Sequence, residues 1–173
     1  MGKISIIDDF LPIKEFSALK EIITSSDFPW NFSKDVVNSN EKKPSPGMFV
    51  HVLYENSPYS PNCPPWLVHL LKYLDIAVLY RIRANLNHRL PAPFYSEFHI
   101  DTDDFDVSQW TTSILYINTN NGYTELESGE IIESVENRLA TFPLGARHRV
   151  CTQTDEQTRY VINFNYLKNK EHG

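Results

Sequence analysis

Cysteine is scarce in this sequence: its 173 residues contain only Cys63 and Cys151, with no CxxC pair. Two cysteines are too few for the disulfide framework that stabilises small secreted domains. Residues 1–6 also lack the apolar core of a signal peptide. We therefore expect a protein of a reducing compartment, and we place it in the cytoplasm.

Long apolar runs and an excess of basic residues are missing as well. The most apolar stretch, residues 67–80, is interrupted by His69, Lys72 and Asp75, whereas a membrane-spanning helix needs ~20 nearly uncharged residues. The 16 Lys and Arg residues are outnumbered by 22 Asp and Glu, which gives a formal net charge of −6. Nonspecific binding to nucleic acid needs a basic surface that displaces counterions. We expect neither a membrane nor a nucleic acid as partner, and the sequence makes no prediction of oligomeric state.

Basic residues are absent altogether from one segment. Between His99 and Asn137 there are nine acidic residues and no Lys or Arg, whereas residues 1–98 carry ten of each sign. An acidic block is usually a solvated surface, but carboxylates with a histidine nearby also bind divalent metals. For the acidic run Asp103 to Asp106 we expect a solvated loop at the mouth of a barrel.

The hydrophobic pattern changes its period near residue 75. Before that point, apolar residues at helical spacing predict helices at 13–25 and 66–74, with short strands at 4–7 and 49–54 and a proline-containing loop at 38–46. After it come eight short segments rich in β-branched and aromatic residues, separated by turn signals such as Asn121-Gly122. These segments are 76–80, 94–100, 111–118, 123–126, 130–135, 138–142, 147–151 and 158–167. The pattern predicts a mainly β fold with flanking helices, closed or folded into two sheets.

The last of these segments has the clearest alternation. One face carries Tyr160, Ile162, Phe164 and Tyr166, and the other carries Arg159, Val161, Asn163 and Asn165. In a small barrel or jelly roll the second face of a strand points into the lumen. Polar residues on that face therefore suggest a bound ligand.

A metal site is indicated by His99 and Asp101, which stand two residues apart and so share one face of a strand. With His148 they would form a triad of two histidines and one carboxylate, which is typical of non-haem Fe(II) oxygenases. The H-x-D spacing alone is weak, but Arg159 follows His148 by eleven positions on the polar face of the last segment. Such an oxygenase needs a cation for the distal carboxylate of 2-oxoglutarate, and arginine offers a bidentate fork.

Taken in order, five motifs resemble the iron- and 2-oxoglutarate-dependent dioxygenase superfamily, and most of all its prolyl 4-hydroxylase-like branch with short bacterial and phage members. The motifs are His99-Ile100-Asp101, Thr112 to Asn118, Asn121 to Glu125, His148, and Thr158 to Asn163. The resemblance implies one domain over residues 1–173, with a double-stranded β-helix (jelly roll) at 76–167 supported by residues 1–75. It implies His99, Asp101 and His148 as the catalytic Fe(II) ligands. It also implies Arg159, with Tyr116 and Thr112, as the carboxylate site of 2-oxoglutarate, and Asn85 as a further contact of that co-substrate.

The implied activity is the hydroxylation of a protein prolyl residue or a small molecule, with O₂ consumed and succinate and CO₂ released; ascorbate is compatible as an additional reductant. Collagen-type prolyl hydroxylases carry Lys where this chain has Arg159, and DNA-repair demethylases of the superfamily carry a second Arg where it has Asn165. Halogenases of the superfamily lack the acidic ligand, which Asp101 provides here.

Two alternatives stay open: a cupin-like metalloenzyme without 2-oxoglutarate, and a noncatalytic jelly-roll binding module. Arg147 and Arg149 flank His148, and we expect them on the opposite face, in a structural or substrate-binding role.

Overall fold

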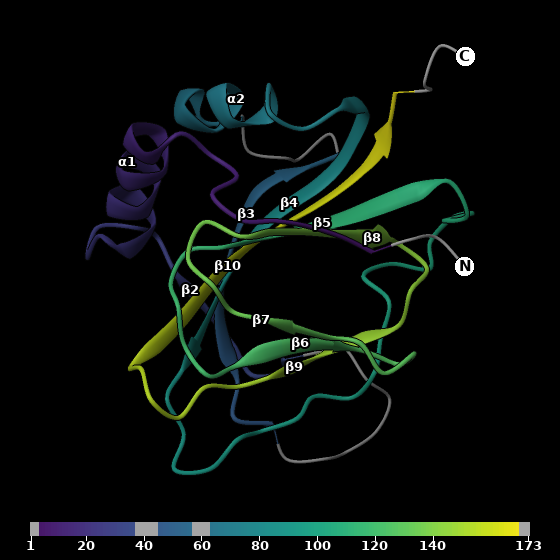
Figure 1. The fold of residues 1–173 in the computed structure, drawn as a ribbon. Coiled ribbons are helices and arrows are strands. Elements are labelled where there is room, and N and C mark those ends of the chain that lie inside the picture. Colours follow the sequence, from purple (N-terminus) through teal and green to yellow (C-terminus); the bar gives the residue numbers. More distant parts are fainter. Residues whose placement is uncertain (1–3, 37–44, 57–62, 170–173) are drawn as a thin grey trace.

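The structure is a computed structural model that describes residues 4–36, 45–56 and 63–169. Two antiparallel β-sheets face each other, and two helices cover the outer face of the larger sheet (Figure 1). The elements are β1 (Ser5–Ile7), α1 (Ile13–Thr24), β2 (Asn31–Ser33), β3 (Met48–Glu55), α2 (Pro65–Leu71), β4 (Ile76–His88), β5 (Trp110–Tyr116), β6 (Tyr123–Leu126), β7 (Ile131–Glu133), β8 (Leu139–Pro143), β9 (His148–Cys151) and β10 (Thr158–Lys168). The mainly β fold with flanking helices is confirmed.

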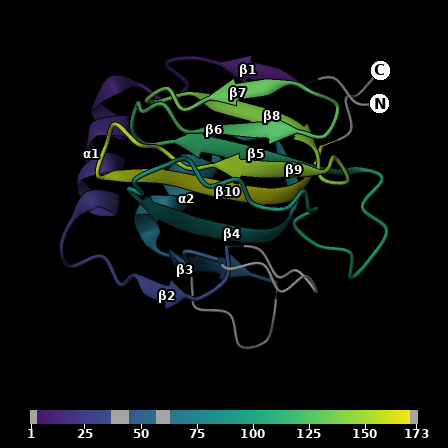
Figure 2. The ribbon, with the colours of Figure 1, turned by 90° about the horizontal axis from the view of Figure 1, so that it is seen from below.

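The larger sheet has seven strands in the order β1-β8-β5-β10-β4-β3-β2, and the smaller has three in the order β7-β6-β9. Seen from below, the small sheet lies in front of β8, β5 and β10, whereas β3 and β2 extend beyond it (Figure 2). The small sheet therefore covers only part of the inner face of the large sheet.

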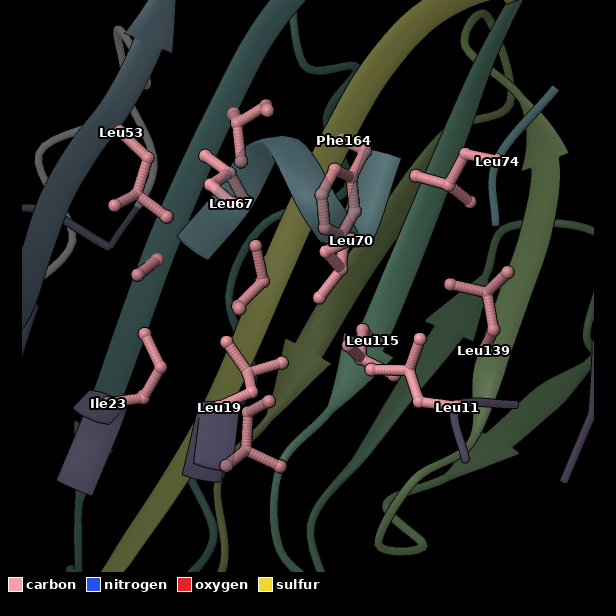
Figure 3. Close-up of a cluster of buried hydrophobic side chains, with 14 of the residues drawn as sticks. Leu11, Leu19, Ile23, Leu53, Leu67, Leu70, Leu74, Leu115, Leu139 and Phe164 are labelled. Carbon is pink, nitrogen blue, oxygen red and sulfur yellow. The ribbon is translucent and has the colours of Figure 1, made fainter. Parts of the chain in front are cut away.

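The main core lies between the helices and the outer face of the large sheet. Each helix follows a proline, at Pro12 for α1 and Pro64 for α2, which suits a first helical turn that needs no backbone donor. Their apolar sides point toward the sheet, with Leu19 and Leu67 close to strands that carry Leu115 and Phe164 (Figure 3). Neither helix is long and apolar enough in its described part to cross a membrane.

The register of β10 explains why its other face is polar. Arg159 lies opposite Asn87, Asn163 opposite Arg83, and Asn165 opposite Arg81 on β4. These side chains lie on the face away from the helices, because the intervening residues Ile162, Phe164 and Tyr166 belong to the helix-side core. The alternation read from the sequence is thus confirmed, and the polar face points toward the small sheet.

Three expectations about the strands were wrong. β4 runs to His88 and not to residue 80, and β2 was not predicted at all. The expected strand at 94–100 is replaced by two isolated bridges, Tyr95 to Cys151 and His99 to His148. Its ladder is interrupted because the hydroxyl of Ser96 accepts the N–H of Val150, where a regular ladder uses a backbone carbonyl. Most of the loop expected at 38–46 lies outside the described residues.

Candidate metal centre

His99, Asp101 and His148 come together at one end of the space between the sheets. One ligand atom from each residue lies within 4.8 Å of the others. The Nε2 atom of His148 is 3.9 Å from Oδ1 of Asp101, and the two imidazole centroids are 4.6 Å apart. The backbones of the two histidines are joined by reciprocal hydrogen bonds of 3.0 and 2.9 Å, so they are cross-strand neighbours. This set of two imidazoles and one carboxylate has the composition that a non-haem Fe(II) site requires.

Both imidazoles are oriented by backbone carbonyls. Nδ1 of His99 lies 3.2 Å from the carbonyl oxygen of Glu97, and Nδ1 of His148 lies 3.2 Å from that of Ala146. A carbonyl only accepts, so each Nδ1 donates its proton and each Nε2 keeps a lone pair for a metal. This is the support by surrounding groups that metal-binding histidines usually receive.

The protonation states of His99 and Asp101 also favour the binding of a metal cation. Burial lowers the pKa of His99 to about 4, and the neighbouring His148 acts in the same direction. Burial alone would raise the pKa of Asp101, but His148, Arg81 and the hydrogen bond from Asn165 outweigh it and hold this pKa below its usual value. Near neutral pH the pair is a neutral imidazole and a carboxylate, which are the forms that bind metal.

The hydrogen bonds to the Asp101 carboxylate are to Oδ2. Nδ2 of Asn165 donates to Oδ2 at 2.7 Å, and the Thr112 hydroxyl donates to the same oxygen at 3.3 Å. Nη2 of Arg81 donates to the backbone carbonyl of Asp101 at 2.9 Å and lies 3.7 Å from Oδ1. With Oδ2 occupied, Oδ1 faces His148 and is the oxygen available to a metal.

Thr112 is thus placed at the metal end of the site and not beside Arg159, where the resemblance put it. The reason is register: Thr112 on β5 lies opposite Asn165 on β10, whereas Tyr116 lies opposite Val161, further along the sheet. Of the two hydroxyls expected at the co-substrate carboxylate, only that of Tyr116 is at the level of Arg159.

Arg159 forms the other end of the site. Its side chain is buried, with Nε donating to the Ser134 hydroxyl at 2.8 Å and Nη2 to the Thr124 hydroxyl at 3.2 Å. The Tyr116 hydroxyl donates to Thr124 at 2.8 Å, and the guanidinium lies 5.4 Å from the Tyr116 ring centre. Burial lowers the pKa of Arg159. In the described part of the chain no carboxylate forms an ion pair with it, and a buried cation without an anion is unfavourable.

A polar cavity connects the two ends. Its lining includes His99, His148, Arg159, Thr124, Asn85 and Asn163. Its volume is about 60 Å³, which is room for a few water molecules. Oδ1 of Asn85, Oδ1 of Asn163 and Nδ2 of Asn87 are buried there without a hydrogen-bond partner. Unpaired buried polar atoms point to a ligand that completes them.

A larger cavity, about 330 Å³ by the same measure, lies between α1 and α2 on the opposite side of the sheet. Most of its lining is apolar, including Leu11, Leu19 and Trp66. The functional groups are at the smaller cavity, because both histidines of the triad and the buried Arg159 guanidinium line it.

Comparisons with known proteins identify the fold. No protein-family model matches the sequence, and no curated protein does either. Among solved structures, a prolyl-4-hydroxylase from Pseudomonas putida matches with a TM-score of 0.63 and 16% identity, over 98% of this chain and 94% of that chain. An oxidoreductase of the 2OG-Fe(II) oxygenase family from Burkholderia pseudomallei matches with a TM-score of 0.71 and 10% identity, over 96% and 86%.

This chain has the fold of the 2OG-Fe(II) oxygenases. HygX from Streptomyces hygroscopicus, whose structure contains nickel and 2-oxoglutarate, also shares the oxygenase fold. Its TM-score is 0.64 at 7% identity, over 97% of this chain and 84% of that chain. At such low identity the residues of the site must be assigned from their own geometry.

Several residues of the site were missed from the sequence. Thr124 and Ser134, the partners of Arg159, come from the small sheet and the segment after it, and a lone hydroxyl residue there carries no distinguishing signal. Arg81 and Asn87 could have been noticed, because β4 alternates apolar Ile82, Ala84 and Leu86 with polar residues. That alternation is the same signal that identified the polar face of β10.

The other predicted residues lie outside the triad. Asp103 and Asp106 are exposed, and Asp104 accepts hydrogen bonds from Thr102 and Tyr80, as in a solvated loop. Arg149 pairs with Glu125 at 2.8 Å, and Arg147 pairs with Glu127 at 3.2 Å. Both arginines therefore take part in ion pairs between neighbouring segments of the small sheet.

Proposed function

We propose that the protein is an Fe(II)- and 2-oxoglutarate-dependent dioxygenase that hydroxylates a small molecule or a peptide side chain, with release of succinate and CO₂. The observation that carries the proposal is a His-Asp-His triad whose two histidines line the same cavity as a buried guanidinium that has no carboxylate partner among the described residues. A triad alone is equally compatible with a cupin-like metalloenzyme. The buried guanidinium favours a co-substrate with a carboxylate at its far end.

The residues present fit both groups. Nε2 of His99, Oδ1 of Asp101 and Nε2 of His148 would hold Fe(II), since their other polar atoms are engaged with the protein. Arg159 would bind the distal carboxylate of 2-oxoglutarate, with the hydroxyl of Tyr116 beside it. When bound, Fe(II) and 2-oxoglutarate supply the oxidising power that inserts an oxygen atom from O₂ into a C–H bond.

The protein's own contribution is geometry and exclusion of water. The backbone bonds to both Nδ1 atoms fix the imidazole planes, and Asn165 and Thr112 fix the carboxylate, so the three ligand atoms converge without rearrangement. Thr124 and Ser134 hold the Arg159 fork in place, which sets the distance between the co-substrate carboxylate and the metal. Asn85 lines the space between these ends.

The test is an anaerobic titration of the metal-free protein with Fe(II) and then 2-oxoglutarate, followed by visible absorption. We expect the weak charge-transfer band that bidentate chelation of Fe(II) by a 2-oxo acid produces. Arg159→Ala loses the band at 2-oxoglutarate concentrations that saturate the wild type, and Arg159→Lys recovers part of the affinity. Arg89→Ala, which changes an exposed arginine just after β4, keeps it. Circular dichroism confirms that each variant is folded.

The outcomes separate the proposal from its alternatives. Fe(II) binding without the band indicates a cupin-like enzyme that does not use 2-oxoglutarate. The absence of any metal binding indicates a noncatalytic jelly-roll module. A band that is unchanged in folded Arg159→Ala contradicts the assignment of Arg159.

A further inference from the structure

Arg83 is a second cation near the metal centre that the proposed reaction leaves without a role. It lies on β4 between Arg81 and Asn85, on the polar face of the large sheet, directly opposite Asn163 of β10. Asn163 stands two residues before Asn165, the residue that donates a hydrogen bond to Asp101. Arg83 is therefore at the metal end of the cavity, away from the level of Arg159.

The Arg83 side chain is incompletely satisfied. Its Nε is buried without a hydrogen-bond partner, and the side chain as a whole is only half-buried. In the described ranges no carboxylate forms an ion pair with it. Burial and the like charge of Arg81 lower its pKa, although Asp101 and Glu55 oppose this. A structural arginine in such a place would be expected to have its donors paired.

Two acceptors stand beside it. Asn163, its cross-strand neighbour, and Asn85, two residues along β4, both line the cavity. The Oδ1 atom of each is buried and has no partner. Two amide oxygens that accept no hydrogen bond therefore accompany a guanidinium whose Nε donates none. Together they form a recognition site for an anion that carries an amino or hydroxyl group nearby.

The balance of charge points the same way and rests on the proposed function. The polar faces of β4 and β10 carry Arg81, Arg83 and Arg159, and among the described residues Asp101 and Glu55 are the anions that act on Arg83, while Arg149 in the cavity lining is paired with Glu125. A substrate carboxylate would place an anion beside the Arg83 guanidinium, whereas a neutral prolyl residue within a peptide offers none.

We propose that the substrate is a small carboxylic acid with an amino or hydroxyl group close to its carboxylate, and that Arg83, with Asn85 and Asn163, binds that end of it. Arg83 is then a determinant of specificity, and the protein acts on free acids and not on peptides.

The test uses the wild-type protein loaded with Fe(II) and 2-oxoglutarate, and the probes are the twenty common L-amino acids and the matching 2-hydroxy acids. Each acid is compared with its primary carboxamide, and Ac-Pro-NHMe serves as the peptide probe. Succinate formation under O₂ is measured over the rate without any probe. We expect at least one acid to raise succinate formation and its carboxamide to have little effect. In Arg83→Gln the concentration of that acid for half-maximal stimulation rises at least ~30-fold, while Arg83→Lys is closer to wild type and Arg89→Gln matches it.

The charge-transfer band distinguishes the two levels of the proposal. If the wild type forms no band with Fe(II) and 2-oxoglutarate, the proposed function itself fails. If the band forms but no acid stimulates, or carboxamides and the peptide act as well as the acids, only the substrate assignment is overturned. If Arg83→Gln loses the band, Arg83 contacts the co-substrate, and this also overturns the assignment. Unchanged stimulation in Arg83→Gln excludes Arg83 as the binding group.

Discussion

Asn165 donates a hydrogen bond of 2.7 Å to Oδ2 of Asp101 across 64 positions of sequence. Asn165 also donates to the Thr112 hydroxyl at 3.1 Å and accepts from Nε of Arg81 at 3.3 Å. One amide therefore links β4, β5, β10 and the acidic member of the triad. The site is supported from the large sheet, although both histidines come from segments that pair on the opposite side.

We predict that Asn165→Leu weakens Fe(II) binding by about 10- to 100-fold, because the substitution frees Oδ2 of Asp101 to turn away from the metal position. Competition with a coloured chelator measures the affinity. Asn31→Ala, which alters an exposed asparagine on β2, serves as the control and leaves it unchanged. Equal affinities for Asn165→Leu and the wild type would show that Asp101 needs no such support.

Removal of a triad side chain has a larger effect. Asp101→Ala and His148→Ala are each expected to abolish Fe(II)-dependent formation of succinate from 2-oxoglutarate, because two ligands cannot hold the metal at the same affinity. Asp103→Ala removes an exposed carboxylate from the neighbouring loop and retains the activity. Wild-type succinate formation in either triad variant would exclude these residues as ligands.

The placement of Thr112 and Tyr116 predicts opposite effects of two small substitutions. Thr112→Val removes a hydrogen bond to Asp101 and raises the dissociation constant for Fe(II) by about 2- to 10-fold, with less effect on 2-oxoglutarate. Tyr116→Phe removes a hydroxyl beside Arg159 and raises the dissociation constant for 2-oxoglutarate by a similar factor, with less effect on the binding of Fe(II). Titration of each ligand separately distinguishes the two. The reverse pattern would indicate that Thr112 contacts the carboxylate of 2-oxoglutarate, as the resemblance implies.

The pH dependence of stability follows from His99, whose pKa is lowered to about 4 by burial and by His148. Between pH 6.5 and pH 4 the unfolded chain binds a proton at this residue and the folded protein does not, so stability falls as the pH is lowered. The loss approaches ~1.4 kcal/mol per pH unit within that range. Urea unfolding of the metal-free protein at pH 7, 6 and 5 measures it. His99→Gln flattens the profile, and a variant as steep as the wild type would assign the effect to another group.

Parts of this site were predictable because they depend on short-range spacing. His99 and Asp101 share a face through their two-residue separation, and the alternation of Arg159 and Asn163 with apolar residues gives the inward face of β10. The level at which Thr112 lies was not predictable, because it depends on which β10 residue faces which β5 residue. Ser134 reaches Arg159 only through the packing of one sheet on the other. The irregular segment 94–100 was missed because the Ser96 side chain takes a role that sequence patterns assign to the backbone.

The bridge between His99 and His148 also bears on how the centre is filled. Their two reciprocal backbone hydrogen bonds place both imidazoles in the folded chain before any metal arrives. Binding then orders few additional degrees of freedom, unlike metal sites that assemble only as the chain folds. We therefore expect the ion to be exchangeable: dialysis against a chelator would strip the protein while leaving its circular dichroism spectrum intact, and a second metal could be loaded into the same vacant position without refolding.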